Sequence, residues 1–384
     1  MNKEVLEKFI LNDVLKEKFD KGYLLEFLFF MALGCYMFYK FGILSGIYNL
    51  MIGGIVVLIL LAVLFFQTYS FKEKIILTLT LIISFIILYT STELNILMIV
   101  LLIFSAKNIS IDDIIKFLLK TYLIFFVFMI IANLLGFYDN DFGIKYMNDT
   151  AVMVKAYGFG HPNQISNRFL AATVMFFFLK RTSFKYSYVI IPCILQIFVY
   201  YISLSRTGLL MFLASVIIYI FTSKLDFEKI ISYILLAGFW FMNVISILLP
   251  FLYADTSRVT QILNRILTGR IRLASNFFEK YDIRLFGQTL DFSGYDNVLD
   301  SAVPYIILTY GVILYAVIIY FSGKLFINSL KLNDYYIIIY FVLFYLIGLS
   351  ELVVINPSYN FTLFFFAKLL DGKTEIVHLK NNLI

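Results

Sequence analysis

The chain has 384 residues, of which 61% are hydrophobic and 15% are charged, and its formal net charge is +6. Its mean hydropathy of +0.90 excludes an ordinary soluble domain of this size, and no nucleic-acid partner is expected. The apolar residues form continuous runs, whereas the strands of a membrane β-barrel alternate between polar and apolar residues. The composition therefore predicts an all-α polytopic membrane protein, because lipid leaves backbone groups unpaired outside helices and closed barrels.

The first predicted element is the charged stretch of residues 1–22, whose apolar side chains could share one helix face. It is predicted to be an amphipathic segment lying on the membrane surface, with a plain solvated helix as the alternative. No cleavable signal peptide is expected.

Twelve apolar runs follow, and each is predicted to be a transmembrane helix, because a bilayer core needs roughly 20 apolar residues per helix. The fourth of them is short. The runs lie near residues 23–39, 46–66, 74–90, 93–106, 114–135, 165–180, 186–204, 208–222, 229–251, 300–321, 335–352 and 358–371. The only cysteines, Cys35 and Cys193, lie far apart inside two of these runs, so they are predicted to be small buried residues without a disulfide or a metal site.

Positive charge sets the predicted orientation, because short cytoplasmic loops are rich in lysine and arginine. With the N-terminus inside, most of the 31 basic residues lie at cytoplasmic ends and both termini are cytoplasmic. The predicted organisation is then a cytoplasmic segment at 1–22, helices 1–5 at 23–136, a first extracytoplasmic loop at 137–164, helices 6–9 at 165–250, a long Arg-rich extracytoplasmic loop at 251–299, helices 10–12 at 300–371 and a cytoplasmic tail at 372–384.

The arginines divide more sharply than the lysines. Seven of the eight arginines fall on the predicted outer side, namely Arg168, Arg206, Arg258, Arg265, Arg270, Arg272 and Arg284. Orientation needs only positive charge, whereas a guanidinium adds a planar fork that binds carboxylate or phosphate in bidentate fashion. These arginines are therefore interpreted as an anion-binding set. The alternative is that individual members pair with lipid head groups or with nearby Asp and Glu.

The two long outer loops carry the polar residues. The first ends within "YGFGHPNQISN" (157–167), and the second contains five of the arginines together with apolar residues throughout, so it should fold. Arg258, Arg265 and Arg272 are spaced by seven, which would place them along one face of a helix lying over the outer mouth of the bundle.

Four outward stretches carry the candidate chemistry: "GHPN" (160–163), "SRTG" (205–208), "GR" (269–270) followed by "LFG" (285–287), and "DN" (296–297) followed by the turn at Gly311. In their order and spacing they resemble the superfamily of Wzy-type polysaccharide polymerases and O-antigen ligases, over roughly residues 155 to 320. The resemblance implies a GT-C-like glycosyltransferase in the bacterial plasma membrane. It would move a glycan from undecaprenyl pyrophosphate onto a lipid-linked repeat unit of capsule, O-antigen or exopolysaccharide, on the outer side of the bilayer. It also implies no metal, no cofactor and no nucleotide sugar, and partners such as a flippase and a chain-length regulator.

The residues fit that chemistry, because fixed guanidinium groups stabilise a leaving pyrophosphate and a sugar hydroxyl needs a general base. Arg206 and Arg270 are predicted to grip the pyrophosphate. Asp296, which stands where ligase-type relatives have a histidine, is predicted to take the acceptor proton, with Asp300 as the reserve candidate. The residues predicted to contact substrate are His161, Asn163, Arg168, Arg258, Arg265, Arg272, Arg284, Asn297 and Asp300.

Each of these residues also has a structural interpretation. His161 could only cap or brace its loop, Asn163 and Asn167 could be N-caps of the next helix, and Asp296 could be an N-cap as well. Arg206 could be a snorkelling arginine. The stretches "YDNDFG" (138–143) and "NDT" (148–150) resemble a metal motif and a glycosylation sequon, and both are taken as loop chemistry.

Two other functions remain open at the level of sequence. Twelve spans with both termini inside is also the layout of many secondary transporters, including a lipid-linked oligosaccharide flippase. Transporters usually show internal repeats and broken helices at the bilayer midplane, and no convincing half-to-half repeat is found here. An O-antigen-ligase-type transferase is the other alternative, which the missing histidine disfavours.

Overall fold

The computed structural model describes residues 21–41, 47–137, 142–147, 150–225, 227–254, 257–293 and 298–370. Within them, eight helical stretches are long and apolar enough to cross a membrane. They are α3 (Lys21–Phe41), α4 (Ile47–Phe66), α5 (Phe71–Ser91), α7 (Ile111–Leu134), α9 (Tyr186–Ser203), α10 (Arg206–Ser223), α11 (Glu228–Phe251) and the continuous stretch of α14 (Ala302–Tyr305), η1 (Ile306–Tyr310) and α15 (Gly311–Leu332). The prediction of an all-helical, multi-pass membrane protein is confirmed.

The other helices are shorter or more polar. They are α6 (Asn95–Ser105), α8 (Pro162–Leu179), α12 (Arg258–Ile266), α13 (Arg270–Lys280), α16 (Tyr335–Ile347), η2 (Phe361–Phe364) and α17 (Phe365–Leu370). Each of the twelve apolar runs predicted from the sequence contains a helix. Three of them, α6, α16 and the η2–α17 stretch, fall below the length of a full span, so the number of crossings stays a prediction.

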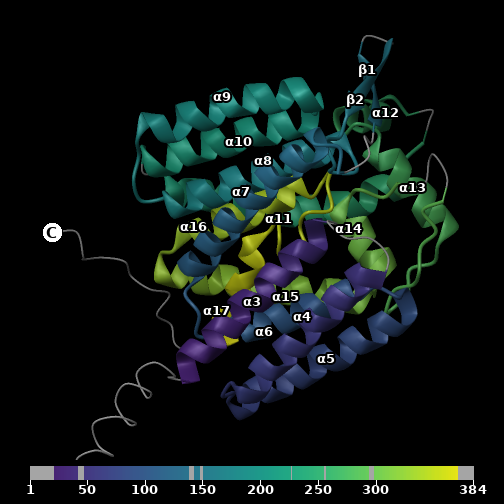
Figure 1. Ribbon diagram of the computed structural model, residues 1–384. Coiled ribbons are helices and arrows are strands. Elements are labelled where there is room, and N and C mark those ends of the chain that lie inside the picture. Colours follow the sequence, from purple (N-terminus) through teal and green to yellow (C-terminus); the bar gives the residue numbers. More distant parts are fainter. Residues whose placement is uncertain are drawn as a thin grey trace, which may run out of the picture.

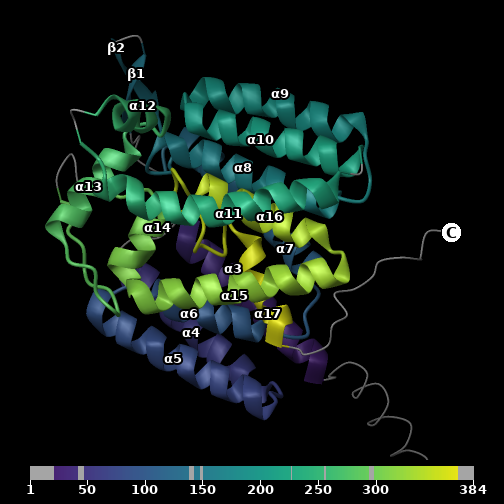
Figure 2. The ribbon, with the colours of Figure 1, turned by 180° about the vertical axis from the view of Figure 1, so that it is seen from behind.

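The helices lie side by side in a thick slab. In both views α9 and α10 lie at one edge and α5 at the opposite edge, with α7, α8, α11, α16, α3 and α15 between them (Figures 1 and 2). The edge helices expose large apolar side chains such as Phe85, Tyr89 and Tyr201. Apolar surface of this extent fits a lipid environment and not water.

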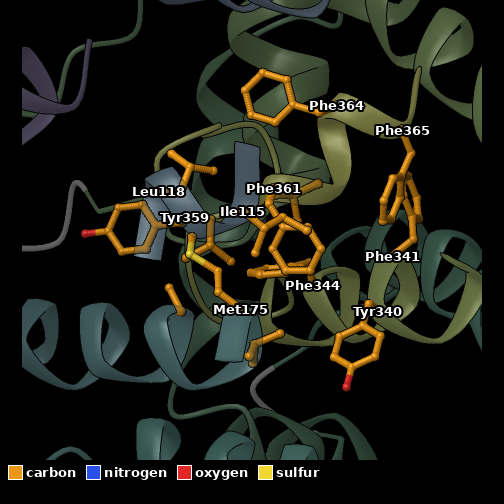
Figure 3. Packing of buried hydrophobic residues seen from close by; sticks show 14 of the residues in the cluster. Ile115, Leu118, Met175, Tyr340, Phe341, Phe344, Tyr359, Phe361, Phe364 and Phe365 are labelled. Carbon is orange, nitrogen blue, oxygen red and sulfur yellow. The ribbon is translucent and has the colours of Figure 1, made fainter. Parts of the chain in front are cut away.

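The short helix α16 lies at the centre of the slab. Eleven of its thirteen residues are buried, and Phe344 meets the ring of Phe361 with centroids 5.6 Å apart (Figure 3). Phe341 and Phe365 belong to the same cluster. A helix enclosed by other helices need not match the bilayer thickness, because its ends and the irregular backbone after them contact protein instead of lipid. This explains why so apolar a helix has only 13 residues.

One end of the slab carries a β-hairpin, and we call it the hairpin end. Here β1 (Phe142–Met147) pairs with β2 (Thr150–Lys155) in an antiparallel hairpin, with Phe142 opposite Lys155. Helices α12 and α13 lie beside it (Figures 1 and 2). The hairpin was not predicted, because the sequence indicated only a loop at residues 137–164.

The expected single helix through Arg258, Arg265 and Arg272 is wrong. Helix α12 ends at Ile266, and α13 begins at Arg270 after Gly269, whose φ of 87° is a left-handed conformation that favours glycine. The chain therefore changes direction between Arg265 and Arg272, so the spacing of seven does not give a common face. The turn instead places Arg270 at the first position of a new helix.

The opposite end of the slab carries two partly buried ion pairs. Lys107 Nζ lies 2.6 Å from Glu73 Oε2, and Arg181 Nη1 lies 3.1 Å from Asp112 Oδ1. Arg181 is the one arginine predicted to face the cytoplasm. The other seven arginines belong to helices or loops that start at the hairpin end or lie there.

Candidate functional site

A close charged pair at the hairpin end joins two of the predicted site residues. Arg270 Nη2 lies 2.7 Å from Asp300 Oδ2, and the two side chains are 14% and 29% exposed. Burial raises the pKa of the Asp300 carboxyl above its ordinary value of 3.8, and the electrostatic interactions with Arg270 and His161 oppose that rise. The sequence placed Arg270 and His161 more than a hundred residues apart, and the fold brings both near one carboxylate.

The backbone holds this pair from both sides. The turn at Gly269 sets the Arg270 side chain at the start of α13. On the other side, Ser301 Oγ donates to the carbonyl of Leu349 at 3.1 Å, and the amide of Ala302 donates to the carbonyl of Gly348 at 2.8 Å. The segment after α16 thus fixes the position of Asp300 relative to the helices.

A cavity of about 140 Å³ lies beside the pair. Its wall is mainly apolar and comes from α11, α13 and the start of α14, with Ser246, Arg270 and Ser301 as polar members. Arg270 Nε is buried and has no hydrogen-bond partner among the described residues. A buried guanidinium N–H without an acceptor costs free energy, so this atom is suited to receive an anionic ligand.

His161 does cap its loop, as its structural interpretation predicted. Its Nδ1 accepts from the amide of Asn163 at 3.2 Å, and Pro162 occupies the first turn of α8. A Cβ added at Gly143 would lie 2.7 Å from Pro162 Cδ, so strand β1 contacts this turn closely. His161 therefore combines a cap with an electrostatic effect on Asp300. The interpretation of Asn163 and Asn167 as N-caps is wrong, because His161 holds the cap position.

Arg168 and Asn167 lie inside the protein instead of on its outer surface. Both are almost fully buried, and Asn167 Nδ2 donates to Glu351 Oε2 at 2.7 Å. Glu351 is a buried charged residue that sequence reasoning missed. The signal was present, because a charged residue interrupting the apolar run "LIGLSELVVI" (346–355) is costly unless it has a role.

The remaining arginines of the predicted set lie on the surface and not beside the Arg270–Asp300 pair. Arg206 is the first residue of α10 and is exposed, directly after Ser205, whose Oγ accepts from the amide of Gly208. Arg258, Arg265, Arg272 and Arg284 are exposed as well. Asp296 and Asn297 lie outside the described residues, as do residues 138–141 and 148–149 of the two loop motifs.

The "LFG" motif has a structural role. The amides of Val312 and Ile313 donate to the carbonyls of Arg284 and Leu285, each at 3.1 Å. A Cβ added at Gly287 would lie 2.0 Å from the carbonyl oxygen of Thr309. The outer loop therefore contacts the backbone where the π-helical turn η1 ends, and the glycines permit that approach.

Comparison with family models, with curated proteins and with solved structures finds no match to this chain. Among the described residues, no group of three or more His, Cys, Asp or Glu side chains is placed to hold a metal ion. The evidence on function is therefore the geometry at the hairpin end.

Proposed function

We propose that the protein is a membrane glycosyltransferase of the Wzy polymerase type. It transfers a glycan from undecaprenyl pyrophosphate to the terminal sugar of a lipid-linked repeat unit in the bacterial plasma membrane. The proposal includes twelve crossings, a GT-C-like fold and a hairpin end on the outer side. The observation that carries it is the partly buried Arg270–Asp300 pair with His161 nearby. Such a transfer needs a cation to stabilise the leaving pyrophosphate and a general base to accept the proton of the acceptor hydroxyl, and this pair supplies both.

The reaction can be written with these residues. The acceptor hydroxyl oxygen attacks the anomeric carbon of the donor, and the bond from that carbon to the phosphate oxygen breaks. The pyrophosphate leaves with the bonding electrons, and the Arg270 guanidinium stabilises the charge that develops on it. The hydroxyl proton passes to the Asp300 carboxylate, which takes the reserve role predicted for it. Asp296 stays the other predicted base, and Arg206 a contact for the lipid-linked pyrophosphate.

Reconstitution tests the activity directly. Purified full-length protein in liposomes, supplied with undecaprenyl-pyrophosphate-linked repeat units, should yield a ladder of longer glycans without ATP, nucleotide sugar or added metal, and with EDTA present. Movement of the repeat unit across the bilayer without any lengthening would instead indicate a flippase and would contradict the proposal.

The orientation can be tested separately by cysteine labelling in whole cells. In a background with Cys35→Ala and Cys193→Ala, the Arg265→Cys variant should react with a membrane-impermeant maleimide, because Arg265 is exposed on α12 at the hairpin end. The matched control is Thr182→Cys, exposed at the opposite end, which should react only after the cells are permeabilised. The reverse pattern would place the site in the cytoplasm and exclude an outer reaction.

The reaction should depend on pH through Asp300. A general base must be ionised, and burial raises the pKa of this carboxyl above its ordinary 3.8 while Arg270 and His161 oppose the rise. Polymer yield should therefore fall as pH decreases through a value above 3.8. The same carboxyl contributes to folding stability in its protonated form, so that contribution is present at low pH and lost as pH rises through the raised pKa.

The control for this pH dependence is Asp291→Asn, because Asp291 is an exposed carboxylate of the same loop. It should leave the yield curve unchanged, whereas Asp300→Asn should lose polymer at every pH. An unaltered curve for Asp300→Asn would exclude Asp300 as the base.

A further inference from the structure

A second pocket opens at the hairpin end, separate from the Arg270–Asp300 pair. It has a volume of about 310 Å³ and lies between the end of α3, the first turns of α8 and the segment after α16. Ligand pockets in proteins start at roughly this size, about 300 Å³. Its polar lining includes Lys40, Gln164, Asn167, Arg168, Glu351 and Tyr359. So many polar groups in one hollow are unusual for a membrane protein of this composition.

The two most deeply buried charges of the pocket have opposite signs. Arg168 is 6% exposed and Glu351 is 7% exposed. Glu351 accepts from the Asn167 amide at 2.7 Å. Lys40 donates to Asn95, which in turn donates to Glu93 Oε2 at 3.1 Å. The lining thus holds the cations Lys40 and Arg168 and the carboxylate Glu351, and the Glu93 carboxylate lies outside the lining, behind Asn95. This charge balance favours an uncharged polar ligand over an anion, which would have to overcome repulsion from Glu351.

Aromatic rings surround the guanidinium of Arg168. Its Cζ lies 4.0 Å from the ring centroid of Phe41, 5.3 Å from that of Phe159 and 5.7 Å from that of Tyr359. Stacking on Phe41 fixes the plane of the guanidinium and leaves its edge for hydrogen bonds. Arg168 Nε is buried without a hydrogen-bond partner among the described residues.

We infer that this pocket binds one uncharged pyranose ring. Sugar hydroxyls donate and accept at once, and the pocket offers both the carboxylate of Glu351 and the donors of Arg168 and Lys40. The rings of Phe159 and Tyr359 supply apolar faces for the C–H groups of the sugar. In the setting of the proposed function, on which this role rests, the pocket is the subsite for a sugar of the acceptor repeat unit. The segment that carries Glu351 also holds Ser301 through the carbonyl of Leu349, so it connects the pocket to Asp300.

Ligand binding tests this inference independently of transfer. Saturation-transfer NMR on the full-length protein in nanodiscs should detect at least one of the methyl glycosides of glucose, galactose, N-acetylglucosamine and N-acetylgalactosamine. Glucuronate and inorganic phosphate, as anionic probes, should not compete with it. Competition by either anion, or no binding by any neutral glycoside, would overturn the inference.

The Arg168→Lys variant should weaken the binding of that glycoside about tenfold, because lysine keeps the charge and loses the stacked, planar donor edge. Arg181→Lys is a matched control, since Arg181 lies over the Phe178 ring at 4.1 Å at the opposite end of the slab. It should leave the affinity unchanged. Equal losses in the two variants would point to general destabilisation and contradict the assignment.

Leu352→Phe provides a second variant that removes no polar group. Leu352 lines the pocket and is half-buried, so a larger side chain there should narrow the pocket and weaken glycoside binding. Unchanged binding in this folded variant would show that the sugar lies elsewhere. If wild-type protein forms a ladder of longer glycans but binds no glycoside, the sugar-binding role of the pocket is wrong and the transferase proposal stands. If it binds a glycoside but forms no ladder, the sugar-binding role stands and the transferase proposal is wrong.

Discussion

Replacing Arg270 with lysine is expected to reduce polymer formation by about 10²- to 10³-fold while leaving membrane insertion intact. Lysine keeps the positive charge but loses the fork that spans Asp300 and an incoming phosphate. Because Arg270 is only 14% exposed and lies 2.7 Å from Asp300, no solvent shell can replace the missing contacts. The measurement is the rate of ladder formation in liposomes, normalised to the amount of folded protein.

A surface pair in the same loop supplies the control for this prediction. Lys280 Nζ lies 3.7 Å from Asp291 Oδ2, and both side chains are about half exposed, at 48% and 58%. Exposed pairs contribute little, so Lys280→Ala should keep nearly full activity. Long polymer from Arg270→Lys at the wild-type rate would refute the role given to Arg270.

Replacing Gly311 with alanine is expected to destabilise the protein by about 2 to 6 kcal/mol. Gly311 has φ 90° and ψ 164°, a region that only glycine adopts readily. An added Cβ would lie 2.3 Å from the carbonyl oxygen of Leu285 and 2.4 Å from the amide nitrogen of Gly287. Both contacts are backbone atoms, so neither can rotate away. Unfolding by detergent titration of the purified protein measures the loss.

Gly323 in the same helix is the matched control. A Cβ there meets nothing within 4 Å, so Gly323→Ala should be neutral or slightly stabilising. If Gly311→Ala unfolds at the same detergent concentration as Gly323→Ala, the contact between the "LFG" segment and η1 is not a structural requirement.

The seven arginines predicted as one anion-binding set divide into two groups in space. Arg168 and Arg270 are largely buried and each lines a different pocket, whereas the other five lie on exposed surface. Exposed guanidinium groups are screened and hydrated, so each of them should affect encounter with a charged lipid more than the transfer step. The residue type was informative for the set, but the sequence could not rank its members.

The sequence alone determined the helical class and the positions of the helices. Continuous apolar runs leave the backbone no alternative to helical hydrogen bonds in lipid, so runs such as 46–66 and 74–90 became α4 and α5 within a few residues. The sequence also indicated which loops between the helices are polar, since charged and glycine-rich stretches cannot remain in the hydrocarbon region. These are local properties, and local composition is sufficient to predict them.

Only the tertiary structure decided which of these residues meet. Arg270 contacts Asp300 because the chain turns at Gly269, and Asn167 contacts Glu351 across 184 residues because α8 lies against the segment after α16. The hairpin and the burial of the short helix α16 were likewise invisible in hydropathy. Contacts between distant segments depend on how helices of similar composition pack together. That arrangement follows from the shapes of many side chains at once, and no single run of sequence encodes it.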